Sequence, residues 1–149
     1  LEDSKSNEEK FLKRIDSITQ KIMTELYILN RCRHENILHS HAVCVSGGDL
    51  HIVLPRLYSL ESLITKYRAK MNGESIPARI IMMVVRQICH GLEFLERSRI
   101  VHRDIQAEYV FVTRGGTVKL GHFGSAKTLD GKEECVTPVG KKEYMCYEK

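Results

Sequence analysis

Three short strings in the sequence carry side chains suited to chemistry. The first, Ile100-Val101-His102-Arg103-Asp104-Ile105, offers an imidazole, a guanidinium and a carboxylate. His122 follows Asp104 by 18 residues, in the string Gly121-His122-Phe123-Gly124. The third string closes the chain as Thr137-Pro138-Val139-Gly140, followed by Tyr144-Met145-Cys146-Tyr147-Glu148. An aspartate suits general-base work and a histidine suits proton transfer or metal binding, but each string alone is weak evidence. Their meaning depends on their order and on the elements that position them.

Apolar periodicity predicts the elements in the first third of the chain. A stripe at helical spacing indicates an amphipathic helix over about residues 17–32. Its members are Ile18, Ile22, Leu26 and Leu29. Residues 41–46 and 50–57 are β-branched and apolar, and Ser46-Gly47-Gly48-Asp49 joins them. Paired glycines tolerate the positive φ of a tight turn, so these two runs predict a hairpin.

Two further helices are expected before the first string. Ser59 precedes a short apolar run and predicts a short helix, which Gly73 would end. Ser75 offers an N-cap and Pro77 fits a first helical turn, so a helix of about 20 residues should follow. The wide apolar stripe of this helix predicts that it lies in the core. The members of that stripe are Ile81, Val84, Val85, Ile88, Leu92 and Leu95.

A second predicted hairpin lies between the first two strings. It pairs Tyr109–Thr113 with Thr117–Leu120 across the turn Arg114-Gly115-Gly116. Residues 121–149 are rich in Gly, Lys and Glu without a clear period, so we expect a loop there. The three strings therefore fall on a frame of helix, loop, hairpin and loop.

Composition excludes several classes of function. The chain has 149 residues and a net charge of +4, and its longest apolar run, Ile80–Val85, has six residues, so no membrane span is expected. The polar, acidic N-terminus excludes a secretory signal peptide as the chain stands. With no Trp and no Lys/Arg run, a nucleic-acid surface is not expected. Five cysteines without a CxxC, and Cys89 directly beside His90, favour a reduced cytoplasmic protein with buried free thiols and no metal site.

In this order and on this frame, the three strings resemble parts of a protein kinase: the catalytic loop, the Asp-Phe-Gly segment and the Ala-Pro-Glu end of the activation segment. Upstream, Glu25 resembles the helix-C glutamate, and Lys13 in residues 11–15 resembles the ATP-phosphate lysine of the third strand. The resemblance covers about residues 11–149. Residues 49–54 and the closing string are also similar to the sterile-twenty group, including its STRAD-type pseudokinase adaptors.

The resemblance implies an α+β, protein-kinase-like fold with two lobes, truncated at both ends. Residues 1–10 would be a frayed N-terminal segment. Residues 11–57 would form a partial small lobe with strand three, helix C and strands four and five. Residues 58–149 would form a partial large lobe through the end of the activation segment. Since the chain begins at Leu1, we expect a fragment of a longer protein.

The same resemblance implies that the site is degenerate. Asp104 matches the base-like aspartate, but Gln106 stands where a kinase has a lysine near the transferred phosphate. Tyr109 and His122 stand at the two metal-ligand positions, normally Asn and Asp. Mg²⁺ prefers oxygen ligands, whereas imidazole suits Zn, Cu or Ni. We therefore expect no Mg²⁺ site, and a phosphotransfer rate lower by several powers of ten.

ATP remains the implied cofactor, although no glycine-rich loop precedes Lys13. The expected nucleotide-binding residues include the gatekeeper and hinge positions. They are Lys13, Glu25, Leu54, Arg56 and Leu57.

Other matched positions are expected to be structural. Leu29, His102 and Phe123 would belong to the hydrophobic column that links the lobes, with Gly124 beside it. Arg103 would pair with a phosphate on the activation loop in an active relative, where Thr128 and Thr137 are available. Glu148 matches the glutamate that pairs with an arginine later in the domain.

Three functions follow as hypotheses. The leading one is a pseudokinase that regulates or scaffolds a partner kinase and retains weak nucleotide binding. The second is a divergent Ser/Thr protein kinase that keeps Asp104 and recruits another metal or carboxylate. The third is a truncated kinase fragment without a function of its own.

Overall fold

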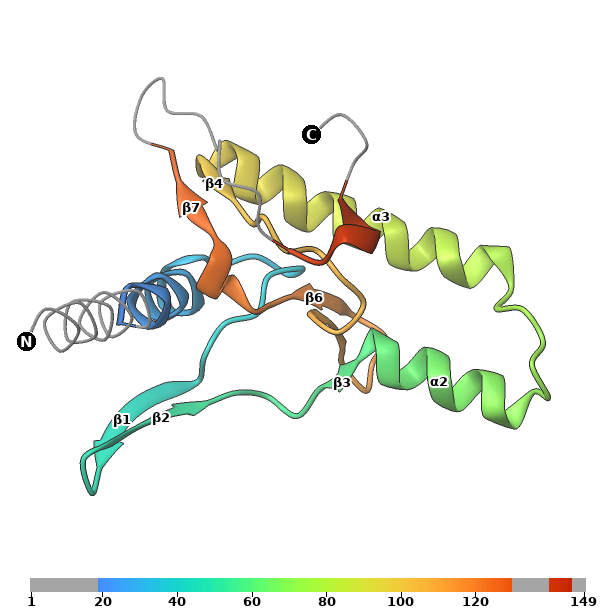
Figure 1. Cartoon of the computed structure of the whole chain (residues 1–149), viewed down its shortest axis with the longest axis horizontal. Helices are drawn as coiled ribbons and strands as arrows, with labels where there is room; N and C mark the ends of the chain where they lie inside the picture. The colour runs from blue at the N-terminus through green and yellow to red at the C-terminus, as the bar shows by residue number, and fades with distance from the viewer. Residues whose placement is uncertain (1–18, 130–139, 146–149) are drawn as a thin grey trace, which may run out of the picture.

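The computed structural model describes residues 19–129 and 140–145 (Figure 1). Residues 19–31 are helical, in agreement with the predicted amphipathic helix. β1 (Ala42–Ser46) and β2 (Asp49–Val53) follow as an antiparallel hairpin, as the paired glycines predicted. Residues 54–57, expected to continue the second strand, lie outside it. Pro55 has no backbone N–H to offer a partner strand, which explains the early end.

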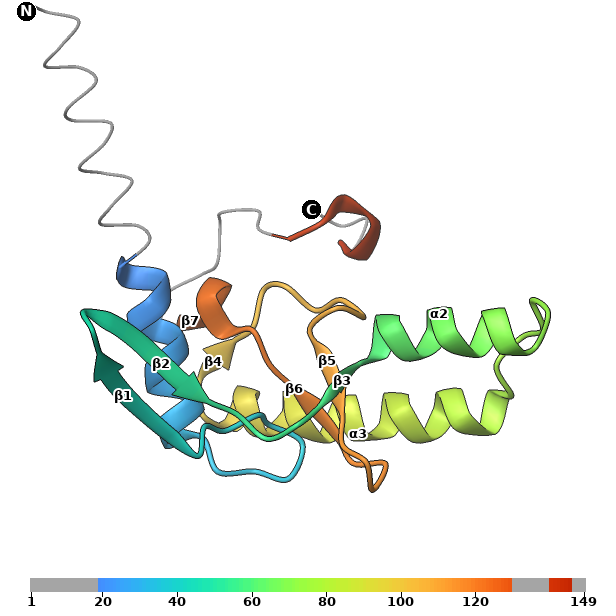
Figure 2. The ribbon, with the colours of Figure 1, turned by 90° about the horizontal axis from the view of Figure 1, so that it is seen from below.

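Two helices come next and run alongside each other at one end of the molecule (Figures 1 and 2). β3 (Tyr58–Ser59) leads into α2 (Leu60–Lys70), whose N-cap Ser59 accepts a hydrogen bond from the Ser62 N–H. The 20-residue α3 (Ala78–Arg97) confirms the long predicted helix. The predicted N-cap at Ser75 is wrong, because Pro77 occupies the cap position and no side chain caps the helix.

Short strands connect the long helix to the remainder of the chain. β4 (Ile100–Val101) pairs with β7 (Lys127–Thr128), and β5 (Val110–Val112) pairs with β6 (Val118–Leu120) and with β3. The β5–β6 pair is the second predicted hairpin. The 3-10 turns η1 (Phe123–Ser125) and η2 (Lys142–Tyr144), together with β7, replace part of the loop expected over residues 121–149.

The core gathers around Phe123, Ile28, Leu29 and Leu120, each exposed by at most 1%. Leu95 of α3 is equally buried, whereas Ile81 and Val85 of the predicted stripe are each 49% exposed. Thus the C-terminal half of α3 packs into the core, whereas Val84 is the one apolar residue of its N-terminal half that packs against it within the described residues. The prediction of buried thiols holds for Cys32 and is wrong for Cys44 and Cys89, which are exposed. No helix in the described ranges is long and apolar enough to cross a membrane.

Asn36 ties the loop after the first helix to the hairpin and to α3. Its side-chain Nδ2 donates to Val118 O at 2.9 Å and to Gln87 Oε1 at 3.2 Å, and the side chain is buried. Its carbonyl accepts from Leu120 N at 2.9 Å. These bonds satisfy buried polar groups and fix the helix of residues 19–31 against the segment that carries His122.

Candidate functional site

The loop between β4 and β5 carries the first motif, and a buried histidine holds it in place. His102 is 3% exposed, and its Nδ1 accepts from the Asp104 N–H at 3.3 Å. Nε2 therefore holds the proton and donates to Gly121 O at 3.0 Å. Burial lowers the pKa of His102, with the Gly121 carbonyl and Asp104 opposing this shift and His122 adding to it. A neutral His102 thus joins the loop to the residue before His122.

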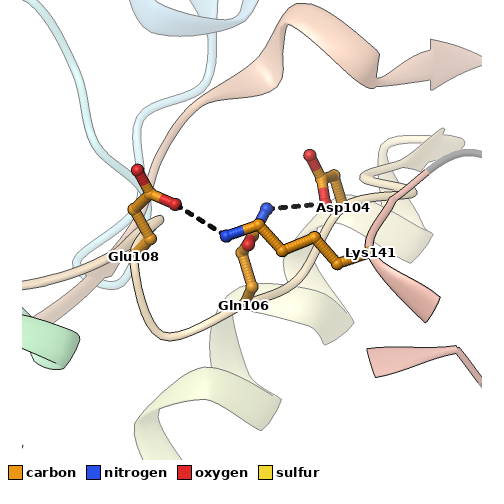
Figure 3. Close-up of polar contacts among 4 residues, drawn as sticks. All are labelled: Asp104, Gln106, Glu108 and Lys141. Atoms are coloured by element: carbon orange, nitrogen blue, oxygen red, sulfur yellow. Dashed lines mark hydrogen bonds and ion pairs between the residues drawn. The ribbon is translucent and has the colours of Figure 1, made fainter. Parts of the chain in front are cut away.

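Gln106 folds back onto Asp104, as Figure 3 shows. Its Nε2 donates to Asp104 Oδ1 at 2.9 Å, and Gln106 is only 3% exposed. The amide Oε1 is buried without a hydrogen-bond partner in the described structure. The neutral Gln106 amide therefore uses one carboxylate oxygen of Asp104, the residue predicted at the base-like position. It supplies no positive charge there.

Tyr109 and His122 stack face to face. Their ring centroids lie 3.9 Å apart with an angle of 24° between the planes. His122 adopts left-handed backbone with φ 59°, and the adjacent Gly121 N–H donates to Tyr109 O at 3.0 Å. Burial first, then the charges of Glu108, Asp104 and Glu25, raises the pKa of Tyr109, while Lys141 opposes them. The phenol therefore stays protonated at neutral pH.

These residues do not fit Mg²⁺. The two positions that would supply carboxylate and amide oxygens hold a phenol and an imidazole whose rings pack on each other. Residues 19–129 and 140–145 contain no group of three His, Cys, Asp or Glu side chains placed to hold a metal ion. The donor chemistry and the ring packing therefore both disfavour the metal that phosphoryl transfer uses.

The structure also brings Gly140 and Lys141 to the loop between β4 and β5, which the sequence did not predict. Lys141 Nζ lies 3.0 Å from Glu108 Oε2 (Figure 3). The hydrogen bond to Glu108 raises the pKa of Lys141. A Cβ on Gly140 would lie 3.2 Å from both Arg103 O and Asp104 Oδ1. Only the position of Gly140 within the third string hinted at this contact.

Glu25 and Arg103 both lie close to the η1 turn that follows His122. The Glu25 carboxylate approaches Gly124, where an added Cβ would lie 3.5 Å from Glu25 Oε2. Arg103 Nε donates to Ser125 O at 2.6 Å. A cavity of about 550 Å³ beside Arg103 is lined in part by Lys21 and Thr128.

The remaining predicted residues lie in separate places. Leu29 and Phe123 are buried, and the Phe123 ring lies 5.1 Å from that of His102. Leu54, Arg56 and Leu57 lie on the connection between β2 and β3, and the described residues show no hydrogen bond or ring contact from them to the Tyr109–His122 pair. Lys13, Thr137 and Glu148 lie outside the described residues.

Comparison with known proteins identifies the family. The chain matches the protein kinase domain over residues 4–149 and belongs to that family. Serine/threonine-protein kinase dst2 of Dictyostelium discoideum is 29% identical over 135 residues, which make up 89% of this chain and 11% of that protein. Serine/threonine-protein kinase Nek3 of Mus musculus is 32% identical over 120 residues, 80% of this chain and 23% of that protein. The chain thus spans less than a quarter of either relative.

A solved structure confirms the fold. A chain of the yeast RNA Pol II CTD kinase CTDK-1 complex matches with a TM-score of 0.65 and 19% sequence identity. The match covers 74% of this chain and 35% of that chain. The molecule is therefore a mixed α and β structure with the protein kinase fold, and it spans part of that domain.

Proposed function

We propose that this kinase domain is a pseudokinase, which regulates or scaffolds a partner kinase and does not carry out Mg²⁺-dependent phosphotransfer. The observation that carries the proposal is the Tyr109–His122 stack, with ring centroids 3.9 Å apart. Each ring replaces an oxygen ligand, and each also fills space against the other. Restoring an oxygen ligand at one position would leave the ring at the other position in place. Metal binding would therefore require both residues to be changed.

The scaffold positions support a regulatory role. His102 and Phe123 remain buried and in contact, and Leu29 is buried in the same core. A chain that had lost all function would have no need to keep this packing beside a replaced metal site. The similarity to STRAD-type adaptors points to a partner kinase, and the structural neighbour is itself part of a complex. Weak, Mg²⁺-independent binding of ATP in the cytoplasm completes the proposal, with Lys13, Glu25, Leu54, Arg56 and Leu57 as its contacts.

The divergent Ser/Thr kinase is kept as a second candidate because Asp104 is present and held by two hydrogen bonds in its loop. A phosphotransfer assay separates the two functions. The pseudokinase should transfer no phosphate above the level of its Asp104→Ala variant, whereas the combined His122→Asp and Tyr109→Asn variant should gain activity. Wild-type transfer that Asp104→Ala abolishes would establish the enzyme instead.

The adaptor role needs its own test. Full-length protein carrying Asp104→Ala should be captured from its native cells and assayed for kinase activity with added ATP and Mg²⁺. Since this variant lacks the base-like aspartate, co-purifying activity belongs to a partner. We expect activity equal to that captured by the wild type. Capture of no kinase activity by either protein would contradict the adaptor role.

A further inference from the structure

Two segments that are far apart in the sequence meet at Asp104 (Figure 3). One is the loop between β4 and β5, which carries both Asp104 and Glu108. The other is residues 140–145, which include the η2 turn. Because a Cβ on Gly140 would lie 3.2 Å from both Arg103 O and Asp104 Oδ1, the backbone of the later segment lies against the Asp104 carboxylate.

Glycine at position 140 permits this close approach. Its φ of 107° is a backbone conformation that residues with a Cβ rarely adopt. The same Asp104 oxygen accepts a hydrogen bond from Gln106 Nε2 at 2.9 Å. Asp104 Oδ1 therefore has two close neighbours, the amide from its own loop and the backbone at Gly140. Any other molecule that approached this oxygen would meet both.

One ion pair joins the two segments. Lys141 Nζ lies 3.0 Å from Glu108 Oε2. The backbone hydrogen bonds of the η2 turn stay within it, from Tyr144 N to Lys141 O and from Met145 N to Lys142 O. Among the residues that the structure describes, the Lys141–Glu108 pair is the one hydrogen-bonded link between residues 140–145 and the loop.

Lys141 interacts with acidic groups from two elements. The hydrogen bond to Glu108 raises the pKa of Lys141, desolvation opposes this rise, and the charges of Glu108, Glu61 and Tyr109 add to it. Glu61 lies in the first turn of α2. Lys141 is therefore cationic at neutral pH. It brings a positive charge to a loop in which position 106 holds a neutral glutamine.

We propose that Lys141 is the latch of an internal closure, in which its ion pair with Glu108 holds residues 140–145 against Asp104 and shields that carboxylate. Lys141 supplies, from a distant segment, the positive charge that Gln106 does not. When the pair breaks, the backbone at Gly140 moves away and Asp104 becomes accessible. Since an exposed ion pair contributes little free energy, the closure is readily reversed. The closure includes neither Tyr109 nor His122, so it goes beyond the proposed function and does not depend on it.

Chemical labelling of carboxylates on the full-length protein measures how accessible Asp104 is. A water-soluble carbodiimide activates the carboxylate, glycine ethyl ester then forms an amide with it as the urea leaves, and mass spectrometry gives the rate at Asp104. Lys141→Gln and Glu108→Gln should each raise this rate about two- to fivefold, the range that an exposed ion pair supports. Glu93→Gln is the matched control and should not change the rate, because Glu93 pairs with Arg97 on the exposed surface of α3.

Reversal of the pair separates the latch from a general change in charge near Asp104. The double variant Lys141→Glu with Glu108→Lys should label as slowly as the wild type. Rising salt should speed labelling of the wild type and leave Glu108→Gln unchanged, since salt screens exposed charges. Thermal melts of the variants establish that they fold.

The proposal is overturned if Asp104 is labelled equally fast in the wild type and in both glutamine variants. It is also overturned if the reversed pair labels as fast as the single variants, or if salt has no effect on the wild type. None of these outcomes depends on phosphotransfer or on nucleotide binding, so the closure and the pseudokinase proposal can fail separately.

Discussion

The phenol ring of Tyr109 packs against the imidazole of His122 at 3.9 Å between centroids. Tyr109 directly precedes β5 and His122 follows β6, so the stack joins the loop between β4 and β5 to the segment after β6. The Gly121 N–H strengthens this junction through its hydrogen bond to Tyr109 O. Tyr109 and His122 therefore form one interacting unit, at the two positions where the sequence predicts that the metal ligands are replaced.

Substitutions at Tyr109 should separate ring stacking from burial. Tyr109→Phe keeps the ring and should leave the free energy of unfolding nearly unchanged. Tyr109→Leu keeps an apolar side chain but removes the stack, and should cost about 0.5–1.5 kcal/mol. Urea denaturation measures both. Equal stability of the Phe and Leu variants would show that the stack contributes nothing.

Gly121 should be intolerant of any side chain. A Cβ there would lie 2.8 Å from Phe111 Cε2 and 2.9 Å from Leu38 Cδ2. Gly121→Ala should therefore lower the free energy of unfolding by about 1–3 kcal/mol. Gly115→Ala is the matched control, since its nearest neighbour would be Thr113 Oγ1 at 3.9 Å, and it should change stability by less than about 0.5 kcal/mol. Similar melting of the two variants would argue against the close packing at Gly121.

Asn36 should be more important for stability than an exposed asparagine. Asn36→Ala removes the donor to Val118 O and leaves that buried carbonyl unpaired, which should cost about 1–3 kcal/mol. Asn30, exposed on the helix of residues 19–31, provides the control. Because Ala favours helix, Asn30→Ala should be neutral or slightly stabilising. Equal losses in chemical denaturation would contradict the anchoring role of Asn36.

The buried His102 should make stability depend on pH. Its folded-state pKa lies below the unfolded value of about 6.5, so the unfolded chain takes up a proton first as the pH falls. The neutral native form is fully favoured above about pH 6.5, and stability declines below that pH until the folded pKa is reached. His39, whose pKa burial also lowers, contributes in the same direction. Urea melts between pH 7.5 and 5 should show a smaller decline for His102→Gln than for the wild type, whereas the exposed His90→Gln should retain the full decline.

The sequence predicted the elements and contacts that depend on local pattern. Gly47 and Gly48 located the first hairpin, and apolar periodicity located α3, because turns and helices are set by residues close in the chain. The prediction that Ser75 caps α3 was wrong, because Pro77, two residues further on, occupies the N-cap position.

Contacts between distant segments were less predictable. The Lys141–Glu108 pair spans 33 residues, and no periodicity reports on it. Gln106 was recognised as uncharged, but its hydrogen bond to Asp104 depends on the burial of the loop. Motif spacing alone singled out Tyr109 and His122, whose assignment as replaced metal-ligand positions stays a prediction, and the structure adds that the two rings contact each other.

The most informative measurement is a thermal melt of the protein with ATP plus EDTA and with ATP plus Mg²⁺. Binding at a hundredfold excess over the dissociation constant stabilises the native state by about 2.7 kcal/mol, which raises the melting midpoint. Because Tyr109 and His122 supply no fitting ligand for Mg²⁺, we expect the same midpoint in both conditions. A midpoint that rises only when Mg²⁺ is present would contradict the pseudokinase proposal and favour the divergent kinase.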